Sequence, residues 1–148
     1  MELQDVLSPE SILIDWSPDS KDGAIIDLVN KLAEADMLLD KKLVIEDVFA
    51  REESLSTGLE DGIAYPHARS EAVDSVVMAF GIVKDGLDFG LRDGSLAVFI
   101  PLMVSPSDGG SPHIYFMAEI VKKLENHEIR TRLMDAETPE EVYNILTQ

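Results

Sequence analysis

Two apolar runs decide the fold of this chain: Val76–Val83, which reads VVMAFGIV, and Leu96–Val104, which reads LAVFIPLMV. Both are continuously apolar rather than alternating, which is the pattern of strands that are covered on both faces. Turns are marked by Lys84-Asp85-Gly86 and by Asp93-Gly94, and Leu87-Asp88-Phe89 alternates like a short edge strand. These runs predict a buried sheet at the centre of the fold.

Two helices and two shorter strands are predicted ahead of these runs. Apolar residues recur at helical spacing in Lys21–Ala35, and a second, less regular helix is expected over Asp40–Glu53. The short apolar piece Ser11–Asp15 is predicted as a first strand. Ile63-Ala64-Tyr65 is a further strand candidate, and it leads directly into Pro66-His67.

Three helices are predicted after the second apolar run. Ser111 is expected as the N-cap of the first, with Pro112 at its first helical position. Its buried stripe is expected to comprise Ile114, Met117, Val121 and Leu124. Glu128–Met134 and Pro139–Thr147 follow, the latter behind the cap Thr138.

Without the short edge-strand candidate Leu87-Asp88-Phe89, the order of these segments is strand, two helices, three strands, three helices. It predicts an α/β (α+β) fold, a three-layer sandwich in which a mixed β-sheet carries helices on both faces. The length of 148 residues fits one domain that spans residues 1–148.

Composition excludes several classes of function. Twelve Lys and Arg against 29 Asp and Glu give a net charge of -17, so the chain has no basic footprint for nucleic acid and would be repelled by acidic membranes. With no cysteine, disulfides and thiolate metal sites are excluded. No apolar run is long enough to span a bilayer, so a soluble cytoplasmic protein is expected. The acidity favours a basic protein partner, or it only aids solubility.

The three histidines are the main candidates for chemistry. His67 follows a proline that fixes the backbone, a placement that suits a nucleophile, although strand-end histidines are also often structural. His113 would lie in the first turn of a helix, where unpaired N–H groups favour an anion and a neutral imidazole. It could equally hydrogen-bond a neighbouring loop. His127 lies in a polar helix junction and is expected to be solvated.

Other catalytic motifs are missing from the sequence. It has no HExxH zinc motif, no GxxxxGK[ST] phosphate loop and no dinucleotide fingerprint. We therefore expect no metal and no bound cofactor.

The segment Ala50–Arg69, which reads AREESLSTGLEDGIAYPHAR, resembles the signature of enzyme IIA domains of the fructose/mannitol type. These domains belong to the bacterial phosphoenolpyruvate-dependent sugar phosphotransferase system. The shared pattern is an RE pair, an S/T-T-G step, a second glycine and then G-I-A-x-P-H-A. The order of predicted elements also agrees, from about Leu7 to Leu146.

The resemblance implies a role for several residues. The family's histidine in the P-H-A step accepts phosphate from the carrier protein HPr, which gives this role to His67. The second active-site histidine corresponds to His113, and the arginine of the RE pair, near the phosphate, corresponds to Arg51. The N–H groups of the loop around Thr57 and Gly58 would also bind the phosphate. The chain departs from the family in having isoleucine after His113, where leucine is usual, and in the Gly-Gly-Ser-Pro stretch that precedes it.

The implied function is that of a histidine phosphocarrier. The phosphoryl group on His67 would pass to an enzyme IIB in sugar uptake, or its presence would control a regulatory target, as in the nitrogen-related branch of the family. We expect no fused IIB, IIC or HPr-like segment, and this favours the regulatory version. The alternatives are a phosphorylation-independent binding module with the same fold and, with least support, a small-molecule enzyme.

Overall fold

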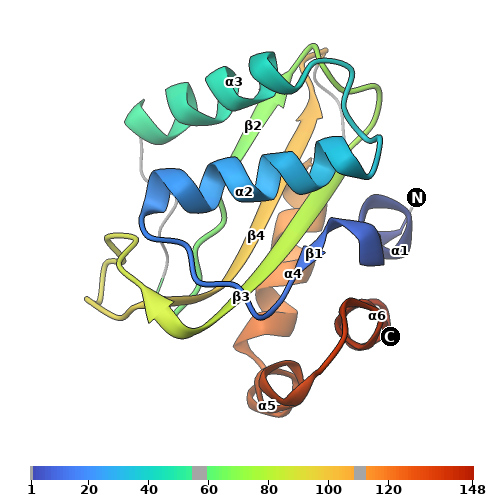
Figure 1. Ribbon diagram of the computed structural model, residues 1–148. Helices are drawn as coiled ribbons and strands as arrows, with labels where there is room; N and C mark the ends of the chain where they lie inside the picture. The colour runs from blue at the N-terminus through green and yellow to red at the C-terminus, as the bar shows by residue number, and fades with distance from the viewer. Residues whose placement is uncertain (1, 55–59, 109–112) are drawn as a thin grey trace.

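A four-stranded sheet in the order β1-β3-β4-β2 forms the middle layer of the molecule (Figure 1). The long strands β3 (Val77–Leu87) and β4 (Ala97–Pro106) pair antiparallel at its centre. The short strands β1 (Ile12–Leu13) and β2 (His67–Ser70) pair in parallel with β3 and β4, respectively. The computed structural model describes residues 2–54, 60–108 and 113–148.

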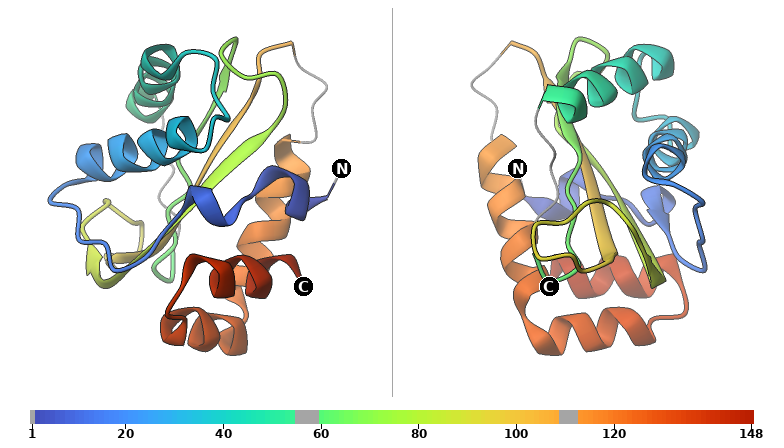
Figure 2. Two further views of the ribbon diagram at one scale, coloured as in Figure 1. Left: turned by 45° about the vertical axis from the view of Figure 1, so that its right-hand side comes forward. Right: turned by 90° about the vertical axis from the view of Figure 1, so that its left-hand side faces the viewer.

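Helices cover both faces of this sheet, as Figure 2 shows. On one face lie α2 (Lys21–Glu34) and α3 (Lys41–Ser54). On the other lie α4 (His113–Glu125), α5 (His127–Asp135) and α6 (Pro139–Thr147). Each layer of helices shares its own hydrophobic core with the sheet. The predicted three-layer α/β class with a mixed sheet is therefore confirmed.

Two short helical elements precede β1 and were not predicted. They are α1 (Leu3–Val6) and a 3-10 helix, Pro9–Ser11. Elements of three or four residues are too short to show an apolar period, which is why the sequence pattern gives no sign of them. Within the three described ranges, no helix is both long and apolar enough to cross a membrane.

The strand predicted at Ile63-Ala64-Tyr65 is wrong in its position. Ile63 makes only an isolated parallel bridge with Phe99, and β2 begins at His67 instead. Proline has no backbone N–H, so a ladder cannot run through Pro66 without a break. The histidine therefore begins the strand and does not follow it.

Two further predictions need correction. Lys84-Asp85-Gly86 does not end a strand, because β3 continues to Leu87 with a shift of register between Ile82 and Leu87. Gly86 has a φ of 80°, so the turn signal marks the irregular part of β3 where its register with β4 shifts. Leu87-Asp88-Phe89 is accordingly not a separate edge strand.

The apolar stripe of α4 is shifted from the predicted one, of which Leu124 is buried and Ile114 is not. Ile114 is 77% exposed, whereas Phe116, Ile120 and Leu124 are buried at a spacing of four residues. Met117 and Val121 are partly buried at the margin of the same core. The predicted cap Ser111 and Pro112 lie outside the described residues.

Side-chain caps begin α2 and α6, and the cap of α6 is the predicted Thr138. Ser20 accepts a hydrogen bond from the N–H of Gly23 at 3.0 Å, and Thr138 accepts one from that of Glu141 at 3.1 Å. Each cap satisfies an N–H group that has no partner within its helix.

The indole of Trp16 packs directly over Gly81 on β3, and this contact requires glycine. An added Cβ at Gly81 would collide with the six-membered ring of the indole. The ring is also held by its Nε1, which donates a hydrogen bond to the Asp27 carboxylate at 2.8 Å. The connection between β1 and α2 is thereby fixed against the sheet.

We predict that Gly81→Ala lowers the free energy of unfolding by about 1–3 kcal/mol, the usual range for overpacking in a buried site. Urea denaturation of the variant provides the measurement. In a Trp16→Ala background the same glycine substitution should be much less destabilising. An equal loss in both backgrounds would show that the indole is not the cause.

Candidate functional site

The segment that leads to His67 runs beside β4 and is tied to it by backbone hydrogen bonds. The carbonyl of Gly62 accepts hydrogen bonds from the N–H groups of Val98 at 2.8 Å and Phe99 at 3.1 Å. The N–H of Ala64 donates in turn to the carbonyl of Phe99 at 3.1 Å. The chain is therefore in register with β4 five residues before the histidine.

The same register continues through the proline into β2. The carbonyl of Pro66 accepts a hydrogen bond from the N–H of Met103 at 3.1 Å, and His67 then pairs with Met103 in the parallel ladder. Proline fixes its own φ and restricts the preceding residue, Tyr65, to extended backbone. His67 is thus supported by a stiff, hydrogen-bonded backbone on both sides.

The imidazole of His67 is oriented by Tyr65 through two contacts. Its Nδ1 lies 3.1 Å from the carbonyl oxygen of Tyr65, and its ring stacks on the phenol with centroids 5.3 Å apart and planes 5° apart. A carbonyl oxygen only accepts hydrogen bonds, so Nδ1 carries the proton in this contact. In the neutral ring the lone pair therefore lies on Nε2, which is the nucleophilic atom.

The surroundings of His67 favour this neutral form. Partial burial lowers the pKa of its imidazole below the usual 6.5, and the positive charges of Arg51 and Arg69 lower it further. The hydrogen bond with the Tyr65 carbonyl and the negative charge of Glu52 act in the opposite direction but do not outweigh burial. His67 is thus favoured in its neutral form at neutral pH.

The predicted site residue Arg51 lies in the last turn of α3, and its charge acts on His67. The next residue, Glu52, is buried with its side chain 5% exposed, and it forms an ion pair with Lys21 at 3.8 Å. The ammonium of Lys21 also lies 5.0 Å from the centroid of the Phe89 ring. The two residues of the RE pair therefore have different roles. Glu52 links α3 to α2, and Arg51 contributes positive charge near His67.

A second guanidinium near the histidine was missed by the sequence analysis. Arg69 lies two residues beyond His67 on β2, so the two side chains project from the same face of the strand. Its Nη1 donates a hydrogen bond to the carbonyl of Pro106 at 3.3 Å. The period of two in a strand was the signal that could have identified it.

The remaining candidates are placed only in part. His113 is the first residue of α4, but its side chain is outside what the structure describes, as are Thr57 and Gly58. His127 is exposed at the start of α5, as predicted. Among the described residues, no group of three or more His, Asp or Glu could hold a metal ion.

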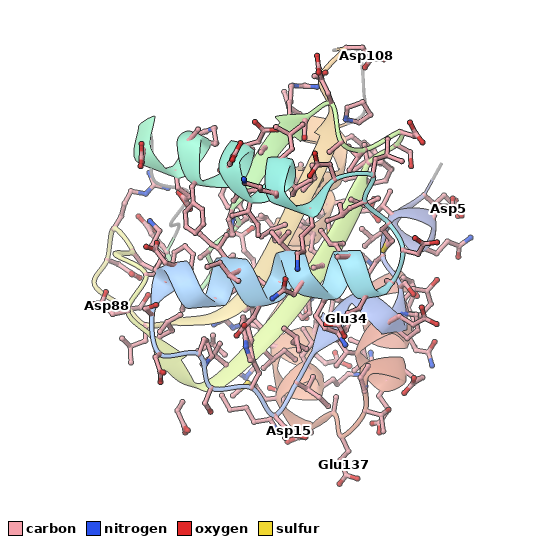
Figure 3. All side chains as sticks on the ribbon, turned by 45° about the horizontal axis from the view of Figure 1, so that its top comes forward. Asp5, Asp15, Glu34, Asp88, Asp108 and Glu137 are labelled. Carbon is pink, nitrogen blue, oxygen red and sulfur yellow. The ribbon has the colours of Figure 1, made fainter. Side chains whose placement is uncertain are left out.

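Carboxylates spread over the rest of the surface, in contrast to the two arginines around His67. Figure 3 labels exposed examples that come from different parts of the chain: Asp5, Asp15, Glu34, Asp88, Asp108 and Glu137. The net charge of -17 is thus distributed around the molecule, while His67 has guanidinium groups close to it.

His67 begins a parallel edge strand, its tautomer is set by a hydrogen bond, and guanidinium groups lie near it. Such a site is suited to phosphoryl transfer. The family model described as "Phosphoenolpyruvate-dependent sugar phosphotransferase system, EIIA 2" matches residues 5–148. The chain therefore belongs to this family, in agreement with the resemblance of its Ala50–Arg69 segment.

Relatives with known names come from several organisms. The fructose-specific EIIABC component of Bacillus subtilis is 29% identical over 148 residues, and the chain spans only 23% of its length. The fructose-specific EIIA component of Haloferax volcanii is 28% identical over 139 residues, which cover 94% of the chain and 90% of that protein.

Solved structures show the same fold. The nitrogen regulatory protein IIA-Ntr from Neisseria meningitidis matches with a TM-score of 0.88 and 30% identity, over 98% of this chain and 99% of that one. The complex of enzyme IIAMTL and phosphorylated enzyme IIBMTL from Escherichia coli matches with a TM-score of 0.79 and 19% identity, over 94% and 95%. At that identity the second match shows the fold alone.

The site geometry predicts that His67 titrates below 6.5, because burial and two guanidinium groups disfavour the imidazolium. NMR titration of the imidazole protons provides the measurement, and Arg51→Met should raise the pKa of His67 by removing one positive charge. Since the folded pKa is depressed, the corresponding contribution to stability is present above pH 6.5 and is lost as the pH falls through the folded value.

Arg132→Met serves as the control for this titration, since it removes a positive charge from the outer surface of α5. A His67 pKa at or above 6.5 in the unmodified protein would contradict the inferred environment.

Proposed function

We propose that the protein is a histidine phosphocarrier that accepts a phosphoryl group from HPr on Nε2 of His67. The observation that carries this proposal is the contact between Nδ1 and the Tyr65 carbonyl, which leaves the lone pair on Nε2. A P–N bond forms to Nε2 while the bond between phosphorus and the donor breaks. The Nδ1 proton stays on His67 throughout, so no general base is needed.

The charge around His67 supports this role. A phosphorylated side chain carries about -1.5 to -2 at neutral pH. The guanidinium groups of Arg51 and Arg69 lie within electrostatic range of the imidazole and offset that charge. The N–H groups around Thr57 and Gly58 and the N-terminus of α4 at His113 are proposed to add further hydrogen bonds.

The acceptor of the phosphoryl group is proposed to be an enzyme IIB or a regulatory target protein. The first is supported by the name of the fructose-specific EIIABC relative, which joins IIA with B and C components. The second is supported by the nitrogen regulatory protein, which this chain matches over nearly its full length. Transfer from the phosphorylated protein to purified IIB distinguishes the two, because a regulator would retain the group.

His67→Ala is predicted to abolish phosphorylation by phosphoenolpyruvate, enzyme I and HPr, because it removes the nucleophile. The measurement is the mass of the intact protein after incubation. The modification should be lost in acid and survive alkali, as expected of a P–N bond. Circular dichroism of the variant checks the fold.

Phosphorylation of a folded His67→Ala protein would contradict the assignment of this residue as the acceptor. Failure of the unmodified protein to accept any phosphate would instead favour the phosphorylation-independent binding module.

Arg51→Ala and His113→Ala are each predicted to slow transfer from phosphorylated HPr by roughly 10²–10³, the usual loss when one charge-stabilising donor is removed. Both variants should still bind HPr. Their effects should not add if both groups hold the same phosphoryl oxygens. Single-turnover kinetics provides the measurement, and a normal rate for either variant would remove that residue from the site.

A further inference from the structure

The guanidinium of Arg130 on α5 joins three separate parts of the molecule. Its Nη2 donates a hydrogen bond to the carbonyl of Asp61 at 2.6 Å, and its Nη1 donates one to the carbonyl of Leu124 at 3.1 Å. Its Cζ lies 5.0 Å from the centroid of the Phe99 ring on β4. One half-buried side chain therefore contacts the segment before His67, the end of α4 and the central sheet.

The contact with Asp61 falls where the backbone needs support. Asp61 and Gly62 both have left-handed backbone, with φ values of 57° and 77°. Glycine adopts this conformation readily, but for Asp61 it is strained and persists because the surroundings hold it. The N–H of Asp61 donates to the carboxylate of Asp93 at 3.1 Å, and the N–H of Gly62 donates to the hydroxyl of Ser95 at 3.1 Å. Arg130 satisfies the carbonyl on the opposite side of the same turn.

This turn sets the register of the segment that carries His67. The carbonyl of Gly62 makes the first contacts with β4, and the pairing then continues to His67 and Met103. A shift of one residue along a strand turns each side chain to the other face of the sheet. If the turn at Asp61 and Gly62 were less firmly held, the position of the Tyr65 carbonyl relative to Nδ1 of His67 would change.

The contact with Leu124 lies at the C-terminal end of α4, whose last four carbonyls have no partner within the helix. The N-terminal residue of that helix is His113. Arg130 thus bridges the two elements that bear both candidate histidines. No pattern in the sequence indicates a role for Arg130, because both of its hydrogen-bond acceptors are backbone carbonyls.

We infer that Arg130 is a positioning residue for phosphoryl transfer: by joining the Asp61 carbonyl to the C-terminus of α4, it fixes the His67 segment relative to the helix that begins at His113. This inference rests on the proposed function of His67. Misplacement of a reacting group by about 1 Å can cost roughly 10²-fold in rate.

The test compares Arg130→Met with Arg132→Met, a matched control on the same helix. Both remove one guanidinium, but Arg132 is exposed and its Nη1 donates to the side chain of Gln148, far along the chain from the site. Methionine retains an apolar stem that can still pack against Phe99. Single-turnover transfer from phosphorylated HPr should slow by roughly 10- to 100-fold in Arg130→Met and be unchanged in the control.

A second readout separates positioning from general stability and needs no phosphorylation. In ¹⁵N NMR spectra of the folded proteins, His67 should show the Nδ1–H tautomer in the unmodified chain and in Arg132→Met. The Nε2–H form should increase in Arg130→Met, because the Tyr65 carbonyl is less firmly held. If the unmodified protein accepts no phosphate, the proposed function fails while this spectrum still decides the role of Arg130.

Arg130→Lys keeps the positive charge, and it provides a second test if Arg130→Met does not fold. A single ammonium on a flexible stem cannot reproduce the fork that reaches two carbonyls, so lysine should restore the rate and the tautomer only in part. The inference is overturned if Arg130→Met matches Arg132→Met in the tautomer of His67, or if Arg130→Lys behaves as the unmodified protein does.

Discussion

The parallel pairing of the His67 segment with β4 is the interaction on which the site depends. Gly62, Ala64 and Pro66 each share a backbone hydrogen bond with β4, and β2 extends the same register from His67 onward. The central strands are buried between two helical layers, so β4 is held rigidly in place. The segments that pair with β4 are therefore held in place as well. The imidazole acquires its orientation from that pairing, through a carbonyl two residues earlier in the chain.

Electrostatics then gives this oriented ring its chemistry. The protein as a whole is strongly acidic, yet the charges that act on His67 include two guanidinium groups, from α3 and from β2. The opposing carboxylate of Glu52 is itself paired with Lys21. Burial and these cations favour the neutral imidazole, and in the proposed function the same cations stabilise an arriving phosphoryl group. One arrangement therefore serves both the nucleophile and its product.

The sequence predicted the layers, the class of fold and the place of His67 in the motif, because apolar period and local motif depend on neighbouring residues. It misplaced the strand beside Pro66 and took the register shift near Gly86 for a turn, since glycine and proline signal a break without saying which kind. Arg69 could have been found from the period of two. Arg130 and Asp93 could not, because each contacts a backbone group of Asp61, 69 and 32 residues away, and no residue pattern records such a contact.

The central claim, that Nε2 of His67 is the acceptor because Nδ1 is committed to the Tyr65 carbonyl, is tested most directly by NMR of the phosphorylated protein. The protein labelled with ¹⁵N in histidine is phosphorylated by phosphoenolpyruvate, enzyme I and HPr, and the ¹⁵N–³¹P coupling is assigned. The account predicts coupling to Nε2 of His67 with a proton retained on Nδ1. Coupling to Nδ1, or to another histidine, would contradict it.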